Sequence, residues 1–276
     1  MQNFIPHLIL TKLMGILANS KNKIIKSLLI RLFVKLYKPS LEEAHVSDIS
    51  KYPTYNSFFI RQLKKEARPI ETSRLSVVSP VDGTIIDHGH LKNNMLLQAK
   101  QHTYSVKELL GEEEKIDRSK SYFITIYLAP TDYHRIHCPF DGYIESTMHM
   151  GKSLFSVNKK AQSKIPFLYI KNERALMKVK NELLSYSLVS VGASIVGSIV
   201  PFWTDGRTKS REDYIREWEV GPEESKKKVL KGQELAHFKM GSTVILIFDD
   251  SSQLELNSLT TNKAIKFGSG LINLKN

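Results

Sequence analysis

Three motifs that lie far apart in the chain carry an acid, a base and a nucleophile: Asp82, His137 and Ser242. Asp82 belongs to an Asp-Gly turn before a predicted strand, His137 lies in a predicted loop, and Ser242 opens an apolar run. A serine hydroxyl is a weak nucleophile that needs a neighbouring base, and a carboxylate can orient that base. The three residues therefore have the types of an Asp-His-Ser triad, although each motif alone is more typical of an ordinary turn.

Other chemistries fit these residues less well. His134, His137 and Cys138 have donor atoms for zinc, but no second cluster of Cys and His with ligand spacing accompanies them, so we expect no metal. Gly151-Lys152-Ser153 resembles the end of a phosphate-binding loop, but Ser146 replaces the glycine that such a loop requires. The G-x-S-x-G elbow of many serine hydrolases is missing from the sequence.

The composition indicates an ordered globular chain that can build a framework around these residues. Its 276 residues are 41% hydrophobic, which excludes global disorder, and Cys138 is the only cysteine, which excludes a disulfide scaffold. We expect an α+β fold, with amphipathic helices in residues 1–70 and a β-rich, mainly antiparallel core in residues 71–276. Helices are expected at Tyr55–Glu66, capped by Asn56 or Ser57, and at Val106–Leu110. The expected strands are Ser76–Val78, Thr84–Asp87, Met95–Ala99, Tyr122–Ala129, Tyr143–Met148, Ala175–Val179, Leu188–Val200, Glu234–Phe238 and Thr243–Phe248.

Positive charge is concentrated at the N-terminus. The chain carries a net charge of +12, and residues 1–40 contain seven Lys and Arg residues and no acid. Apolar residues form one helical stripe between these charges: Ile24, Ile25, Leu28, Leu29, Leu32, Phe33 and Leu36. A basic amphipathic helix of this kind is typical of peripheral binding to an anionic membrane. Two alternatives remain, since the same stripe could pack on the protein's own core or form a dimer contact.

Neither this segment nor the uncharged stretch Leu183–Thr204 is predicted to span a membrane. The N-terminal apolar runs are too short, and they lack the organisation of a signal peptide. In Leu183–Thr204, valine and isoleucine alternate with small residues, which predicts strands joined at a glycine turn. Nucleic acid is not an expected partner, because the basic residues lie on an apolar-faced helix rather than among exposed aromatic side chains.

Taken together, the motifs resemble those of the bacterial membrane-associated phosphatidylserine decarboxylases. The likeness covers about residues 55–250 and includes further motifs in the same order. They are Phe58-Phe59-Ile60-Arg61-Gln62-Leu63-Lys64, Arg68-Pro69-Ile70, Leu97-Gln98-Ala99-Lys100, Phe155-Ser156-Val157-Asn158, Asn172-Glu173-Arg174, Val191-Gly192-Ala193, Val196-Gly197-Ser198, Lys231-Gly232-Gln233-Glu234 and Phe238-Lys239-Met240-Gly241-Ser242-Thr243-Val244. Two positions depart from the family pattern: Met240 stands where leucine is usual, and Lys159 stands where histidine is frequent.

The resemblance implies a self-processing enzyme that decarboxylates phosphatidylserine to phosphatidylethanolamine. In such enzymes the serine attacks the preceding glycine, here Gly241, and the chain divides into residues 1–241 and 242–276. Ser242 becomes a covalent pyruvoyl group, which forms a Schiff base with the substrate and serves as the electron sink. The resemblance assigns His137 as the base for cleavage, Asp82 as its partner, and His134 a role in decarboxylation.

The same resemblance predicts the partners and the location. The two cleaved chains are expected to stay together as a heterodimer, and the family suggests a homodimer of these. The substrate places the enzyme peripherally on the cytoplasmic face of the cell membrane. The alternative function is an Asp-His-Ser serine hydrolase that acts on lipid without cutting its own chain.

Overall fold

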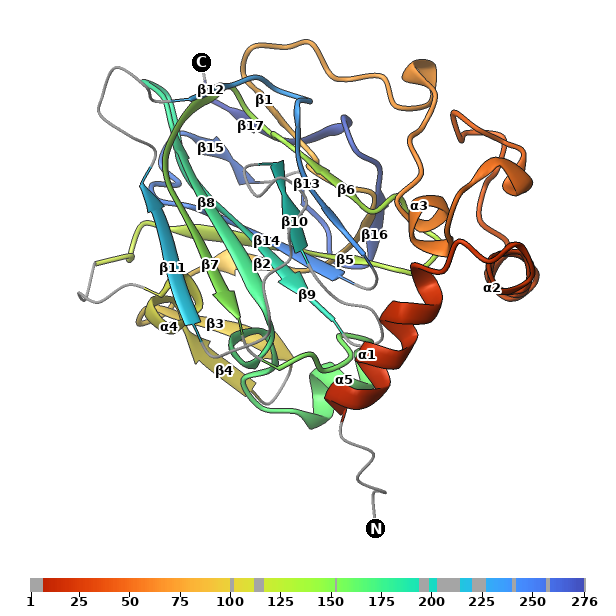
Figure 1. The fold of residues 1–276 in the computed structure, drawn as a ribbon. Helices are drawn as coiled ribbons and strands as arrows, with labels where there is room; N and C mark the ends of the chain where they lie inside the picture. Colours follow the sequence, from red (N-terminus) through yellow and green to blue (C-terminus); the bar gives the residue numbers. More distant parts are fainter. Residues whose placement is uncertain are drawn as a thin grey trace.

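The computed structural model describes residues 7–99, 102–111, 117–151, 153–193, 199–202, 214–219, 227–239, 242–256 and 259–275. Helices α1 (His7–Ala18) and α2 (Lys23–Tyr37) lie to one side of a β-rich body, where Figure 1 shows them in red. Asn22 caps α2 by accepting hydrogen bonds from the amides of Ile24 and Ile25. The helical segment has its own small core, which includes Ile30, Phe33, Phe58 and Phe59.

Helix α3 (Tyr55–Phe59) is shorter than expected and begins at a different cap. Thr54, rather than Asn56 or Ser57, caps the helix, and the Thr54 and Ser57 side chains form a reciprocal capping box. The helix ends early because the following residues pair with the segment after α2. The Lys64 amide donates to the Glu43 carbonyl at 2.9 Å, and Ala44 and Leu63 form an isolated antiparallel bridge. The 3₁₀ turns η1 (Ile49–Lys51) and η2 (Lys65–Ala67) complete the segment.

The body is built around one nine-stranded antiparallel sheet, which confirms the expected α+β class. Strand β14 (Ser242–Phe248) lies in the middle of this sheet, between β5 (Tyr122–Leu128) and β9 (Ser185–Gly192), and all seven of its residues are buried. Strand β12 (Lys228–Val229) pairs with β7 beside the main path. The order along that path is β11 (Tyr214–Glu219), β7 (Gly142–Gly151), β8 (Arg174–Lys180), β9 (Ser185–Gly192), β14 (Ser242–Phe248), β5 (Tyr122–Leu128), β2 (Gly83–His90) and β16 (Lys263–Ile265).

Two small sheets cover one face of the large sheet, and Val244 and Leu246 of β14 point into this interface. One small sheet joins β10 (Ile199–Pro201), β13 (Glu234–Phe238) and β6 (Arg135–His137). The other joins β1 (Ser76–Val78), β17 (Gly270–Leu274) and β15 (Leu254–Glu255). Strand β6 corrects the expectation that His137 lies in a loop, because backbone pairing with β13 extends the strand from Arg135 to His137.

The opposite face packs on a hairpin and short helices, with Ile245 and Ile247 of β14 in this second cluster. The hairpin is β3 (Met95–Ala99) and β4 (His102–Ser105), and the helices are α4 (Val106–Leu110), α5 (Lys159–Lys164) and α6 (Leu168–Lys171). The stretch Leu183–Thr204 contains strands, as predicted, since β9 ends at Gly192 and β10 begins at Ile199 in another sheet. Within the described ranges, no helix is both long and apolar enough to cross a bilayer.

Candidate active site

Ser242 is the first residue of β14 and is buried at the centre of the largest sheet. It pairs with Leu128 on one side and with Gly192 on the other. Its side chain is fully buried, and its Oγ has no hydrogen-bond partner in the described part of the chain. A buried hydroxyl without a partner is unfavourable and therefore unusual in a purely structural position. The preceding Gly241 and Met240 lie outside the described residues.

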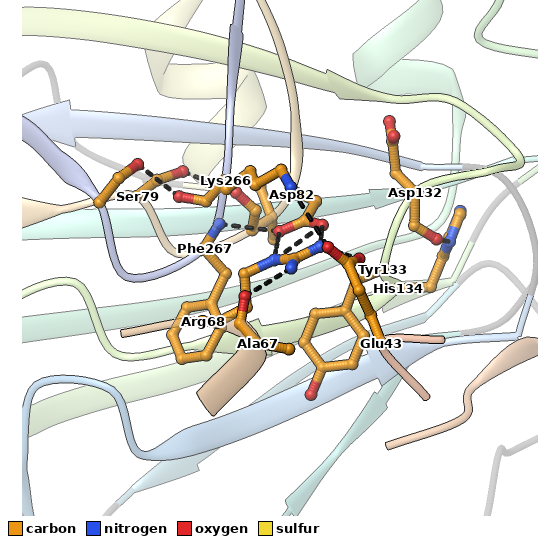
Figure 2. A network of polar contacts seen from close by, with 12 residues as sticks. Glu43, Ala67, Arg68, Ser79, Asp82, Asp132, Tyr133, His134, Lys266 and Phe267 are labelled. Atoms are coloured by element: carbon orange, nitrogen blue, oxygen red, sulfur yellow. Dashed lines mark hydrogen bonds and ion pairs between the residues drawn. The ribbon is translucent and has the colours of Figure 1, made fainter. Parts of the chain in front are cut away.

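Asp82 is held by a dense set of hydrogen bonds (Figure 2). The Arg68 guanidinium donates to both carboxylate oxygens, with its shortest contact at 2.6 Å, and the Phe267 amide donates at 2.8 Å. Arg68 also donates to Glu43 at 2.9 Å. Planar, two-pronged binding of this type fixes the orientation of the carboxylate.

His137 is a neutral base in a defined tautomer. Its Nδ1 lies 2.9 Å from the Gly232 carbonyl, which can only accept, so Nδ1 carries the proton. Its Nε2 accepts from the Tyr133 hydroxyl at 3.2 Å. Burial lowers the pKa of His137 to about 4, while the nearby negative charge of Asp82 opposes that change. At neutral pH the ring is therefore uncharged, and Nε2 carries the lone pair.

Asp82 and His137 are neighbours, but Phe267 lies between them in place of a direct hydrogen bond. The Phe267 amide binds Asp82, and the Phe267 ring stacks on the His137 ring with centroids 3.7 Å apart and an interplanar angle of 16°. In the Asp-His-Ser triads of hydrolases, the carboxylate accepts a hydrogen bond from Nδ1–H. Here the Gly232 carbonyl has that place, and Asp82 acts on the imidazole through its charge.

His134 lies at the opposite end of β13 from His137. The register pairs Glu234 with His137, whereas the Phe238 amide donates to the His134 carbonyl at 2.9 Å. Phe238 is the residue from which the chain continues to Ser242. His134 is fully buried, donates from Nδ1 to the Asp132 carbonyl at 2.7 Å, and has no partner for Nε2 among the described residues. Burial lowers the pKa of His134 to about 3, so this imidazole is also neutral.

An open cavity of about 890 Å³ reaches His137 from the surface. Arg68, Tyr133 and Phe267 line it together with His137, and Lys64 and Lys65 add positive charge. Tyr133 and Phe267 are not among the residues to which the sequence motifs assign a role, and Arg68 appears there only in the motif Arg68-Pro69-Ile70. Tyr133 could have been found from its place beside His134, but no sequence signal points to Phe267. In the described ranges, no group of three or more His, Cys, Asp or Glu is placed to hold a metal ion.

Comparison with known proteins identifies the family. A family model described as phosphatidylserine decarboxylase matches residues 55–273, and a second one, described as PSD, matches residues 1–38. The chain belongs to the phosphatidylserine decarboxylase family. A phosphatidylserine decarboxylase proenzyme from Vibrio parahaemolyticus is 39% identical over 90% of this chain and 88% of its own length.

Two further relatives extend the match to almost the whole chain. The phosphatidylserine decarboxylase proenzymes of Escherichia coli and Klebsiella pneumoniae are each 38% identical over 98% of this chain, covering 85% and 86% of their own lengths. These names confirm the family predicted from the motifs, and they give no support to the serine-hydrolase alternative. The match of residues 1–38 to a model of their own agrees with a helical segment that accompanies the phosphatidylserine decarboxylase core.

Proposed function

We propose that this chain is a proenzyme that cuts itself between Gly241 and Ser242 and then decarboxylates phosphatidylserine to phosphatidylethanolamine and CO2. The observation that carries this proposal is the buried, unpartnered Oγ of Ser242 at the start of β14, in a chain of this family. Every relative compared above is named a proenzyme, which agrees with processing into two chains.

Self-cleavage needs a base for the Ser242 hydroxyl, and His137 has the required protonation state. In this scheme His137 Nε2 receives the hydroxyl proton, and the negative charge of Asp82 stabilises the imidazolium. The oxygen attacks the Gly241 carbonyl carbon, and the Gly241–Ser242 amide becomes an ester. Loss of the Ser242 α-proton then breaks the Cβ–O bond, which frees the carboxylate of residue 241. In the described part of the chain, His137 is hydrogen-bonded to Gly232 and Tyr133 and not to Ser242, so the proton transfer requires bridging water or a movement near residue 242.

Elimination leaves dehydroalanine at position 242, and its hydrolysis by water, with release of ammonia, is proposed to give the pyruvoyl group, the electron sink that decarboxylation of an amino acid requires. The site fits such a group, because position 242 is enclosed and, among the described residues, its side chain has no competing hydrogen bond. His134 lies at the end of β13 from which the chain continues to Ser242, and its Nε2 has no partner among the described residues. We assign to His134 the handling of a proton during decarboxylation.

The helical segment is proposed to dock on the membrane that holds the substrate. The stripe seen in the sequence divides between two faces. Phe33 packs inward beside Ile30, a residue outside the stripe, whereas Ile24, Leu28, Leu32 and Leu36 are between 50% and 79% exposed. The α2 stripe therefore serves the protein's own core in part only, and the outward row has the apolar character that an interfacial helix needs. Phe59 of this segment contacts the His134 ring, with centroids 4.2 Å apart, so the segment adjoins the site.

Denaturing electrophoresis with mass measurement tests the proposal. Purified protein should convert without added protease from 31.5 kDa into chains 1–241 and 242–276, and the small chain should lack an N-terminal amine. Ser242→Ala should remain a single chain. Wild-type protein that stays intact and still releases CO2 from phosphatidylserine would refute the mechanism.

A further inference from the structure

Arg68 forms an ion pair with Asp82 in the interior of the protein rather than on its surface. Its guanidinium is enclosed by the Asp82 carboxylate, the Glu43 carboxylate and the Ala67 carbonyl. The side chains of Arg68 and Asp82 are only 7% and 8% exposed. Desolvating such a pair is unfavourable unless the geometry is well matched, so a retained pair of this kind calls for a functional explanation.

Phe267 carries this arrangement on to His137. Its amide is fixed by Asp82, and its turn is anchored on the segment before Asp82. The Gly268 amide donates to the Ser79 carbonyl at 3.1 Å, and the Ser79 amide donates to the Ser269 carbonyl at 2.9 Å. The Phe267 ring then lies flat on the imidazole, with centroids 3.7 Å apart. A ring held in this way restricts rotation of the histidine about its χ2 angle.

We infer that Arg68 and Phe267 are positioning residues for His137: Arg68 fixes Asp82, Asp82 fixes Phe267, and the Phe267 ring holds the imidazole in its orientation. The inference rests on the proposed role of His137 in self-cleavage. It connects three parts of the chain, since Arg68 follows the N-terminal helices, Asp82 directly precedes β2, and Phe267 belongs to the segment downstream of the cleavage site.

The arrangement also limits the charge that His137 experiences. Several charged and titratable groups surround His137. Arg135 precedes it on its own strand, Glu234 lies opposite on β13, and Tyr133 is hydrogen-bonded to Nε2. Asp82 lies behind Phe267, and Arg68 lines the same cavity as His137. Arg135 disfavours the imidazolium and Asp82 favours it. Because Arg68 compensates the charge of Asp82, its removal should strengthen the field of Asp82 and raise the pKa of His137.

The electrostatic part is tested in protein that cannot cut itself. In a Ser242→Ala background, histidine NMR titration would follow the His137 ring in Arg68→Gln and Arg68→Lys proteins. We expect the His137 midpoint to rise by about one pH unit in Arg68→Gln and to stay near its starting value in Arg68→Lys. Arg118→Gln is the matched control, because Arg118 is a buried arginine paired with Asp249 at 2.8 Å in another part of the body. An unchanged midpoint in folded Arg68→Gln would overturn the electrostatic link.

The stacking part is tested by the rate of chain cleavage. Phe267→Leu should slow the conversion about tenfold or more, and Phe267→Tyr, which keeps the ring, should recover most of the rate. Phe248→Leu is the matched control, since Phe248 is another buried aromatic of the downstream segment, with its ring near Tyr186. Near-UV circular dichroism and thermal unfolding would verify that each variant folds.

The outcomes separate this inference from the proposed function. Wild-type protein that does not cleave removes the proposed function, while the titration of the uncut background still tests the Arg68 link. Normal cleavage of Phe267→Leu, or failure of Phe267→Tyr to recover the rate in folded protein, overturns the positioning role of Phe267. If Arg68→Gln does not fold, the pair of Phe267 variants decides the inference.

Discussion

The carbonyl of His134 accepts the amide hydrogen of Phe238 at 2.9 Å, four residues before Ser242 in the chain. His137 pairs instead with Glu234, at the other end of β13. At the usual rise of a strand, Glu234 lies about 13 Å from Phe238. The two histidines of one motif therefore occupy different ends of the site. Both proposed steps take place at position 242, so variants of each histidine test which step it serves.

Substituting each histidine by alanine should separate these steps. His137→Ala is expected to accumulate full-length chain, because the base for the Ser242 hydroxyl is lost. His134→Ala should cleave at least in part but lose most of its decarboxylase activity. Electrophoresis gives the extent of cleavage, and release of labelled CO2 gives the activity. Normal processing of His137→Ala, with blocked processing of His134→Ala, would exchange the two roles.

Asp82→Ala should impair both cleavage and stability. The substitution leaves the buried guanidinium of Arg68 with one carboxylate, Glu43, and removes the acceptor for the Phe267 amide. Breaking a buried ion pair typically lowers the free energy of unfolding by about 3–5 kcal/mol. Denaturant unfolding measures this loss. Asp249→Ala, which breaks the pair with Arg118, serves as the control: it should be destabilised and still cleave.

Gly232→Ala should disturb the turn whose carbonyl orients His137. Gly232 has a φ of +81°, where an L side chain is strained, and an added Cβ would collide with the Ile70 side chain. We expect slower cleavage and a free energy of unfolding lowered by about 1–2 kcal/mol. Ile70→Ala in the same protein should recover part of the cleavage rate by relieving the collision. No recovery would assign the whole effect to backbone strain.

Acid should destabilise the uncut protein through its buried histidines. Burial lowers the pKa of His134 to about 3, and those of His137 and His237 to about 4, from a value of 6.5. The unfolded chain therefore binds more protons than the folded chain between these values. The free energy of unfolding should therefore be highest above about pH 6.5, where these histidines are neutral in both states, and should fall as the pH falls toward 4. Urea unfolding of Ser242→Ala across this range measures the slope, which His237→Gln should reduce.

Charge on the outer face of α2 should release the protein from membranes without unfolding it. Placing Asp at Leu28, Leu32 and Leu36 removes exposed apolar side chains and should weaken binding to anionic vesicles at least tenfold. Self-cleavage should continue. Ile30→Asp is the contrasting variant, because Ile30 is 1% exposed and its change should unfold the helical segment. Full flotation of the triple variant on anionic vesicles would exclude this row as the main anchor.

The general architecture could be predicted from the sequence, because the strand patterns and the apolar stripe of the basic N-terminal segment are local properties. The β6 segment could not, since Arg135–His137 is a strand only through its pairing with β13, almost a hundred residues later. The residue types of the site were visible in three motifs, but their connections were not. Phe267 belongs to none of the motifs, and only the folded chain brings its ring against His137.

The central place of β14 has a consequence for the processed protein. After cleavage, the short chain that begins at residue 242 would still hold the middle of the nine-stranded sheet, hydrogen-bonded to β5 and β9 along its length. The nine-stranded sheet would then be built from two separate chains, both of which are needed for refolding. Recovery from denaturation would become a second-order reaction that slows on dilution, whereas the uncut precursor refolds as a single chain. At low concentration the unfolded mature protein would therefore refold poorly. The rate of unfolding, rather than the equilibrium free energy of unfolding, should then determine how long the mature protein survives.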